Sequence, residues 1–94
     1  MSGKPHYAEA VIVNDLGLHT RSATALVKMA GSFSSEIILS ADGLSANAKS
    51  IMGLLALGAR KGTLIRIEAA GVDQEAAAAA IVQLISSGFR EEAT

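Results

Sequence analysis

The chain has 94 residues, half of them apolar, which is enough for one compact domain with a core of Ile, Leu, Val and Ala. It contains no cysteine, so disulfide bonds, Cys-ligated zinc and thiol chemistry are excluded. The formal net charge of −1 predicts no nucleic-acid partner, and the lack of a long apolar run or a signal peptide predicts a cytoplasmic protein without membrane insertion.

The first 31 residues predict one strand followed by one helix. Residues 7–13, YAEAVIV, favour a strand, which ends in the turn-like sequence NDLG. From residue 20 to about residue 30, apolar side chains recur at the helical spacing. Gly31 is a C-terminal stop signal for this helix. His6, before the first strand, is expected to be solvent-exposed at a frayed terminus.

The middle of the chain predicts a β-hairpin. Residues 35–40, SEIILS, favour a second strand, and residues 44–48 favour a short third strand. Asp42 and Gly43 between them are a hairpin signal, because glycine tolerates the positive φ that such turns require.

The last part of the chain predicts two helices on either side of a strand. Residues 50–57 favour a short helix closed by Gly58. In residues 63–69, TLIRIEA, apolar and charged side chains alternate, which is typical of a half-buried strand. Asp73 is a candidate N-cap for a final helix over residues 74–87, which is rich in alanine.

The element order is therefore β-α-β-β-α-β-α. It predicts a two-layer α+β open-faced sandwich, in which three helices cover one face of a four-stranded antiparallel sheet. A single domain over residues 1–94 is expected, with a core from about residue 7 to residue 87. Gly88 is expected to end the last helix, and residues 89–94 to form a polar tail.

The stretch GLHTRSA, residues 17–23, places His19 where the first helix is expected to begin. The backbone amides of Thr20, Arg21 and Ser22 are then among the donors that lack an intrahelical acceptor. Together with the helix dipole and the Arg21 guanidinium, they predict an anion site suited to a phosphoryl group. A neutral imidazole there can act as a nucleophile without a metal or a cofactor. Spacing alone leaves open that His19 is an ordinary exposed residue at a helix end.

Two motifs resemble the HPr family of phosphocarrier proteins, which belong to the bacterial phosphoenolpyruvate-dependent phosphotransferase system. The first is GLHTRSA after the first predicted strand, and the second is NAKSIMGLLALGARKG, residues 47–62, at the second predicted helix. Both occur in the β-α-β-β-α-β-α order of the family, and the resemblance runs from about residue 7 to residue 87.

The resemblance implies a protein that relays a phosphoryl group and is not a stand-alone enzyme. It also implies a monomer. His19 matches the histidine that phosphorylated enzyme I phosphorylates on Nδ1, and that passes the phosphoryl group to a histidine of an EIIA-type protein. Arg21 matches the arginine beside it. The family usually has proline where this chain has Ser22. Serine restores a backbone donor that could face the phosphoryl group, but it loosens the unfolded chain, at a cost of about 0.4–1 kcal/mol.

Ser50 has two interpretations that the sequence leaves open. It is a natural N-cap for the second helix. It also matches the serine that a dedicated kinase phosphorylates in some bacteria to regulate HPr. A phosphate there would add negative charge beside the expected partner face and impede docking of an acidic partner.

A partner-binding surface is expected next to His19, on one face of the first helix and on the second helix. Leu54 and Leu57 are assigned to the core instead. The low charge of the surface favours the nitrogen-related branch of the family over the sugar-transport branch. Its predicted members are Thr20, Thr24, Val27, Lys28, Ile51, Met52 and Leu55.

Two other functions remain compatible with the sequence. A regulatory adaptor could bind target proteins through the face that carries His19 and Met52, with phosphorylation as its signal. A ligand-binding module of ferredoxin-like type could be built from the same order of strands and helices. The acceptor proteins are not determined by the sequence.

Overall fold

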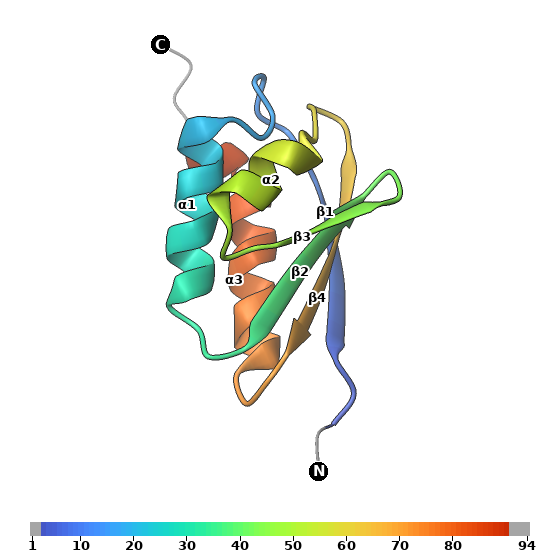
Figure 1. Cartoon of the computed structure of the whole chain (residues 1–94), viewed down its shortest axis with the longest axis vertical. Coiled ribbons are helices and arrows are strands. Elements are labelled where there is room, and N and C mark those ends of the chain that lie inside the picture. The colour runs from blue at the N-terminus through green and yellow to red at the C-terminus, as the bar shows by residue number, and fades with distance from the viewer. Residues whose placement is uncertain (1–2, 91–94) are drawn as a thin grey trace.

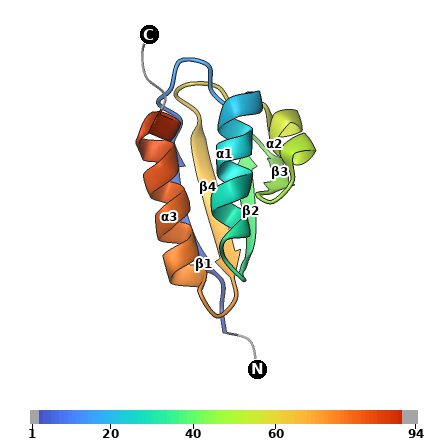
Figure 2. The same cartoon turned by 90° about the vertical axis from the view of Figure 1, so that its left-hand side faces the viewer.

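The computed structural model describes residues 3–90, in which three helices cover one face of a four-stranded antiparallel sheet (Figure 1, Figure 2). The sheet has the order β1-β4-β2-β3. Its strands are β1 (His6–Val11), β2 (Glu36–Ala41), β3 (Leu44–Asn47) and β4 (Leu64–Ala70). The helices are α1 (Thr20–Gly31), α2 (Ile51–Leu57) and α3 (Gln74–Ser86), followed by a 3₁₀ turn (Gly88–Arg90). The predicted two-layer α+β fold and its element order are confirmed.

The core lies between the sheet and the helices. In β4, Ile65, Ile67 and Ala69 are fully buried, while the alternate residue Arg66 is exposed. Leu26 of α1 is fully buried in the same cluster, as are side chains of β2 and α3. Each buried Leu or Ile stabilises the fold by about 1.5–3 kcal/mol relative to an exposed one. The alternation seen in the sequence of β4 therefore sets which of its faces meets the helices.

Glycine and aspartate make the two tight turns that the sequence predicts. Asp42 and Gly43 have φ of +53° and +81°, so both central residues of the β2–β3 turn are left-handed, as a type I′ hairpin requires. Gly58 ends α2 with φ of +59°, and its N–H donates to the carbonyl of Leu54 at 3.2 Å. Both predictions are confirmed.

The first strand starts earlier and ends earlier than expected. His6 is the first residue of β1, where it is half-buried and lies opposite Ala69 of β4, so the prediction of an exposed residue at a frayed end is wrong. The strand ends at Val11, although the N–H of Ile12 still donates to the Thr63 carbonyl at 3.0 Å. Pairing with β4, rather than side-chain pattern, sets these ends.

The end of α3 also differs from the prediction. Phe89 is only 6% exposed and belongs to the core, so the predicted polar tail does not begin at residue 89. Gly88 has φ of +70° and lies beside Val13 and Asn14, and this turn returns Phe89 toward the core. Residues 91–94 of the predicted tail lie outside the described residues.

The C-terminal end of α1 and the N-terminal end of α3 lie close to their predicted positions, but their capping groups differ from the prediction. α1 runs one residue beyond its predicted end, through Gly31, and Ser32 is its C-cap. Asp73 occupies the N-cap position of α3, as predicted, but its carboxylate makes no capping hydrogen bond. It binds the chain before β2 instead. Within residues 3–90, none of the helices is long and apolar enough to cross a membrane.

Candidate functional site

His19 is the N-cap residue of α1, directly before Thr20, which is where the sequence places it. Its backbone is extended, with φ of −136° and ψ of −175°, and its carbonyl accepts the first helical hydrogen bond, from the N–H of Ala23 at 2.8 Å. The side chain is half-buried. The imidazole is therefore held at the start of a twelve-residue helix and remains partly open to solvent.

Ser22, three residues into the same turn, ties His19 to the preceding loop. Its hydroxyl oxygen accepts from the backbone N–H of His19 at 2.9 Å, and the hydroxyl lies 2.8 Å from the Gly17 carbonyl, to which it donates. It also lies 3.2 Å from the His19 carbonyl. The Ser22 N–H in turn faces the His19 side chain. Together with the bond from the His19 N–H to the Ser22 hydroxyl, this reciprocal arrangement is a capping box. Ser22 is fully buried, so solvent does not compete for these groups.

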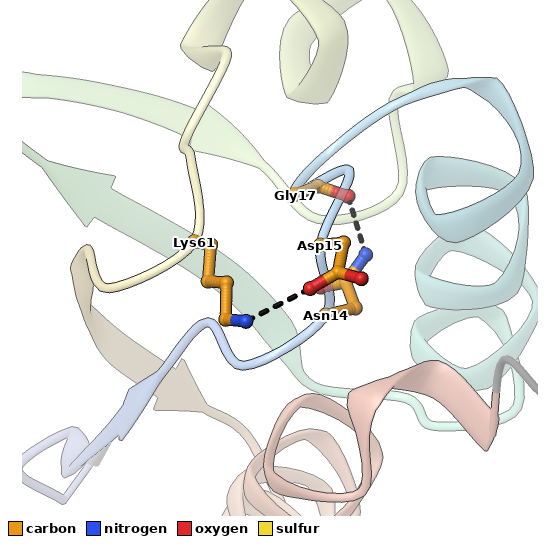
Figure 3. Close-up of polar contacts among 4 residues, drawn as sticks. All are labelled: Asn14, Asp15, Gly17 and Lys61. Carbon is orange, nitrogen blue, oxygen red and sulfur yellow. Dashed lines mark hydrogen bonds and ion pairs between the residues drawn. The ribbon is translucent and has the colours of Figure 1, made fainter. Parts of the chain in front are cut away.

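Gly17 is the point at which the loop passes closest to a second segment. Its φ is +63°, and a Cβ atom there would lie 2.4 Å from the Ala59 carbonyl oxygen, so no larger residue fits without movement. The next N–H, that of Leu18, donates to the same Ala59 carbonyl at 2.8 Å. The Gly17 carbonyl also accepts from Nδ2 of Asn14 at 2.9 Å (Figure 3). Contacts within the loop of residues 14–18 and with Ala59 thus fix the approach to His19.

An ion pair lies on the outside of this loop. Nζ of Lys61 is 2.8 Å from Oδ1 of Asp15 (Figure 3). The hydrogen bond from Lys61, and then its positive charge, lower the pKa of the Asp15 carboxyl. Both side chains are exposed, and pairs of this kind contribute little to stability. The ion pair nevertheless engages the positive charge of Lys61 at the end of the molecule where His19 lies.

The predicted phosphoryl-binding groups lie together at the start of α1. Thr20 and Arg21 are its first two residues and are exposed, and amides at these positions of a helix have no intrahelical acceptor. The amide of Ser22 follows, on the side of the His19 ring. With the positive end of the helix dipole and the charge of Arg21, this is an electropositive helix start beside a potential nucleophile.

The α2 part of the expected partner surface is exposed and apolar. Met52 is 81% exposed, and Ile51 and Leu55 are 38% and 39% exposed. Leu54 and Leu57, on the opposite side of this short helix, are buried, which confirms their assignment to the core. α2 packs against α1 near the end of the molecule that carries the loop before His19 (Figure 1, Figure 2).

The α1 part of the expected surface is more mixed. Thr20 and Lys28 are exposed, whereas Thr24 and Val27 are half-buried. The Thr24 hydroxyl donates to the Thr20 carbonyl at 2.7 Å, and Val27 packs partly on the core. The predicted residues of α1 therefore lie along the helix that follows His19, but Val27, the apolar one among them, is less exposed than the apolar residues of α2.

Ser50 serves as the cap that the sequence predicts. Its backbone is extended, and its hydroxyl oxygen accepts from the Gly53 N–H at 3.0 Å. The first helical bond follows, from the Leu54 N–H to the Ser50 carbonyl at 3.0 Å. Ser50 is half-buried and directly precedes the exposed residues Ile51 and Met52.

Comparison with known proteins identifies the family. Residues 7–87 match the family model described as "PTS HPr component phosphorylation site". The chain belongs to the HPr family. A phosphocarrier protein HPr of Xylella fastidiosa is 40% identical over 84 residues, which are 89% of this chain and 94% of the relative. The phosphocarrier protein NPr of Escherichia coli K12 is 42% identical over 82 residues, 86% of this chain and 91% of the relative.

Solved structures of the HPr family share the fold. A crystal structure of HPr from Thermoanaerobacter tengcongensis superposes with a TM-score of 0.87 at 42% identity, covering 93% of this chain and 98% of that one. HPr from Bacillus anthracis superposes with a TM-score of 0.84 at 31% identity, covering 88% and 99%. HPr proteins are phosphocarriers and not stand-alone catalysts, and a phosphoryl-carrying role in the phosphotransferase system follows from membership of the family.

Three features of the HPr-like site were not found from the sequence. Asn14 was interpreted only as part of a turn, although asparagine side chains often hydrogen-bond backbone groups of the turn they form. Leu16, 71% exposed in the same loop, adds an apolar side chain that the predicted surface omits. Ala59 supports the loop through its backbone carbonyl alone, which no sequence pattern reveals.

Among residues 3–90, no group of three His, Cys, Asp or Glu side chains could hold a metal ion.

Proposed function

We propose that this HPr-family protein carries a phosphoryl group on Nδ1 of His19. The observation that carries the proposal is the position of His19 as N-cap of α1, directly ahead of the amides of Thr20 and Arg21. A phosphoryl group on the ring would bring negative charge to the positive end of the helix dipole. The guanidinium of Arg21 adds a fixed positive fork for its oxygens. Phosphoryl transfer requires such positioning and charge stabilisation more than acid–base chemistry.

The proposed donor is phosphorylated enzyme I, and the proposed acceptor is a histidine of an EIIA-type protein. In the first transfer the lone pair of the His19 nitrogen forms an N–P bond as the N–P bond of the donor histidine breaks, and the donor ring keeps the electron pair. The second transfer repeats this step toward the acceptor. The phosphoryl group originates from phosphoenolpyruvate. No cofactor of the carrier takes part, and the carrier acts as a cytoplasmic monomer.

The exposed residues of α2 support a docking role beside His19. Ile51, Met52 and Leu55 are exposed apolar side chains of α2, which packs against α1, the helix that carries Thr20, Thr24, Val27 and Lys28. A few exposed apolar side chains suit partners that associate weakly and leave quickly, as a relay requires. The same side chains could serve a regulatory adaptor, but a pure adaptor has no use for a histidine at a helix start.

The proposal is tested by phosphorylating the protein with its own organism's enzyme I, phosphoenolpyruvate and Mg²⁺, and recording phosphorus NMR spectra. An acid-labile phosphohistidine signal is expected for the wild type, and its absence is expected for His19→Ala. A previously characterised carrier, charged in parallel, controls for the activity of enzyme I. If that carrier is labelled and this protein is not, the carrier function is wrong and the adaptor takes its place.

A further inference from the structure

The Ser22 hydroxyl makes several hydrogen bonds with the backbone around His19. One hydroxyl accepts from the N–H of His19 at 2.9 Å and donates to the carbonyl of Gly17 at 2.8 Å. It thereby joins the residue on each side of Leu18 to the first turn of α1. Ser22 is fully buried, so removal of its hydroxyl takes this acceptor from the His19 N–H at a site away from bulk water, while the Gly17 carbonyl keeps the bond from Asn14.

These hydrogen bonds constrain the residue that bears the imidazole. The His19 carbonyl is already held by the Ala23 N–H at 2.8 Å, and the hydroxyl of Ser22 holds the N–H on the other side of the same Cα. With both peptide groups fixed, the direction of the Cα–Cβ bond of His19 is fixed as well.

Two other residues support the loop before His19. Asn14 binds the Gly17 carbonyl, and Ala59 binds the Leu18 N–H. They fix the loop where it passes Ala59, one and two residues before His19. The Ser22 hydroxyl, in contrast, is hydrogen-bonded to the backbone of His19 itself, whose N–H donates to Ser22 Oγ at 2.9 Å. Ser22 thus couples a supported loop to the helix start.

We propose that Ser22 is a positioning residue for phosphoryl transfer at His19, an inference that rests on the proposed carrier function. Its hydroxyl holds the His19 backbone and thereby the direction of the Cα–Cβ bond, so that the nucleophilic nitrogen meets the incoming phosphorus in line. Rates of transfer are sensitive to misplacement of reacting groups by as little as about 1 Å. The Ser22 hydroxyl touches neither the donor nor the acceptor and acts through His19, whereas the Ser22 backbone amide belongs to the predicted phosphoryl-binding groups and is kept in Ser22→Ala.

The test compares Ser22→Ala with Ser35→Ala. Both serines are fully buried, and both hydroxyls are hydrogen-bonded, but the hydroxyl of Ser35, directly before β2, donates to Asp73 and not to the loop that precedes His19. The two variants therefore share the loss of a buried hydroxyl and differ in its place. Each is measured for exchange of the His19 backbone amide, the ¹⁵N chemical shifts of its ring, and the kinetics of phosphorylation by phosphorylated enzyme I.

Ser22→Ala is expected to speed exchange of the His19 amide by roughly tenfold, to shift its ring resonances, and to lower the rate at saturating donor by roughly fivefold to tenfold without changing the KM. Ser35→Ala is expected to leave all of these at wild-type values per folded molecule. The unchanged KM separates positioning from docking, because Ser22 is fully buried and offers a partner no side-chain surface.

Two results overturn the inference. If Ser22→Ala keeps the wild-type rate per folded molecule, the hydroxyl does not position His19 for transfer. If Ser35→Ala slows transfer as much as Ser22→Ala, the effect is one of general stability. Failure of the wild type to accept a phosphoryl group removes the proposed function and this inference together, which distinguishes that failure from the first two.

Discussion

The carboxylate of Asp73 accepts hydrogen bonds from both the backbone N–H and the hydroxyl of Ser35, a residue 38 positions earlier in the chain. Its second oxygen accepts from the N–H of Ser34 at 2.9 Å. Asp73 thus joins the start of α3 to the segment between α1 and β2. The close approach is possible because Gly71, with φ of +155°, has no Cβ atom, which would lie 2.6 Å from the Ser35 hydroxyl oxygen.

This carboxylate makes the stability depend on pH in acid. The hydroxyl of Ser35, and then the N–H of Ser34, lower the pKa of Asp73 from its usual 3.8. A carboxyl whose pKa is lower in the folded state stabilises the fold above its unfolded pKa, and this stabilisation is lost as the pH falls through the folded pKa. The free energy of unfolding, measured in urea between about pH 5 and pH 2, is therefore expected to fall below about pH 4.

Asp73→Asn is expected to flatten this part of the pH dependence, because the amide does not titrate. Glu75→Gln is the matched control, since Glu75 is exposed in the first turn of the same helix. Equal slopes for Asp73→Asn and the wild type would show that Asp73 does not contribute to the acid dependence.

The contact between Gly17 and Ala59 predicts a second outcome. Gly17→Ala has to accommodate a Cβ atom 2.4 Å from the Ala59 carbonyl oxygen at a φ of +63°. Gly43→Ala is the matched control, because Gly43 has φ of +81° and no atom within 4 Å of a Cβ placed there. We expect about 1–2 kcal/mol of lost stability from the left-handed φ alone in Gly43→Ala.

Gly17→Ala is expected to lose more than this, with the excess due to the contact with Ala59. It is also expected to shift the amide resonances of Leu18 and His19, which the control leaves in place. Denaturant unfolding and two-dimensional NMR spectra measure both effects. Equal destabilisation by the two substitutions would show that the loop moves away from Ala59 at no cost.

These two contacts also show where sequence analysis reached its limit. The alternation Ile65, Arg66, Ile67 and the glycine at residue 58 act over a few residues, so their pattern predicted β4 and the end of α2. Asp73 was predicted as a cap from the same kind of local signal, but its carboxylate binds residues 38 and 39 positions away. A local rule cannot weigh a partner that only the folded chain brings near.

In the candidate site, too, local features were predicted and contacts between distant segments were not. His19 was placed at a helix start because the glycine before it and the helical period after it are local features. The support of its loop by Ala59 is a backbone contact between distant segments, and it leaves no trace in the sequence. Ser22 was recognised as a departure from the usual proline, but its hydroxyl contacts became visible only in the structure.

The third prediction concerns Ser50, whose two interpretations, helix capping and regulation, can be tested separately by substitution. Ser50→Ala removes the acceptor of the Gly53 N–H and is expected to cost about 1 kcal/mol of stability. Ser50→Asp keeps a capping oxygen, so its stability is expected to remain near that of the wild type. Thermal unfolding followed by circular dichroism measures the difference between the two variants.

Regulation at Ser50 predicts that only the added charge affects transfer. We propose that Ser50→Asp, as a substitute for a phosphoserine, raises the KM for phosphorylated enzyme I, because it places negative charge next to Ile51 and Met52. Ser50→Ala is expected to keep the wild-type KM. The same KM for Ser50→Asp and Ser50→Ala would leave capping as the sole role of this side chain.

The opposite faces of α2 provide the last prediction. Met52 is 81% exposed and Leu54 is fully buried, although they are two residues apart on one short helix. Leu54→Ala removes a core side chain and is expected to cost about 2–5 kcal/mol of stability. Met52→Ala removes nothing from the core, so its stability is expected to stay within about 0.5 kcal/mol of the wild type.

Only Met52→Ala is expected to change the KM for phosphoryl transfer. Met52→Ala reduces the apolar area available to partners, so the KM for phosphorylated enzyme I is expected to rise severalfold while the rate at saturation stays constant, since His19 is untouched. Leu54→Ala, assayed where it is still folded, is expected to keep the wild-type KM. A KM that does not respond to Met52→Ala would mean that partners approach His19 without contacting α2, and the docking surface would then have to lie along α1 and the loop that carries Leu16.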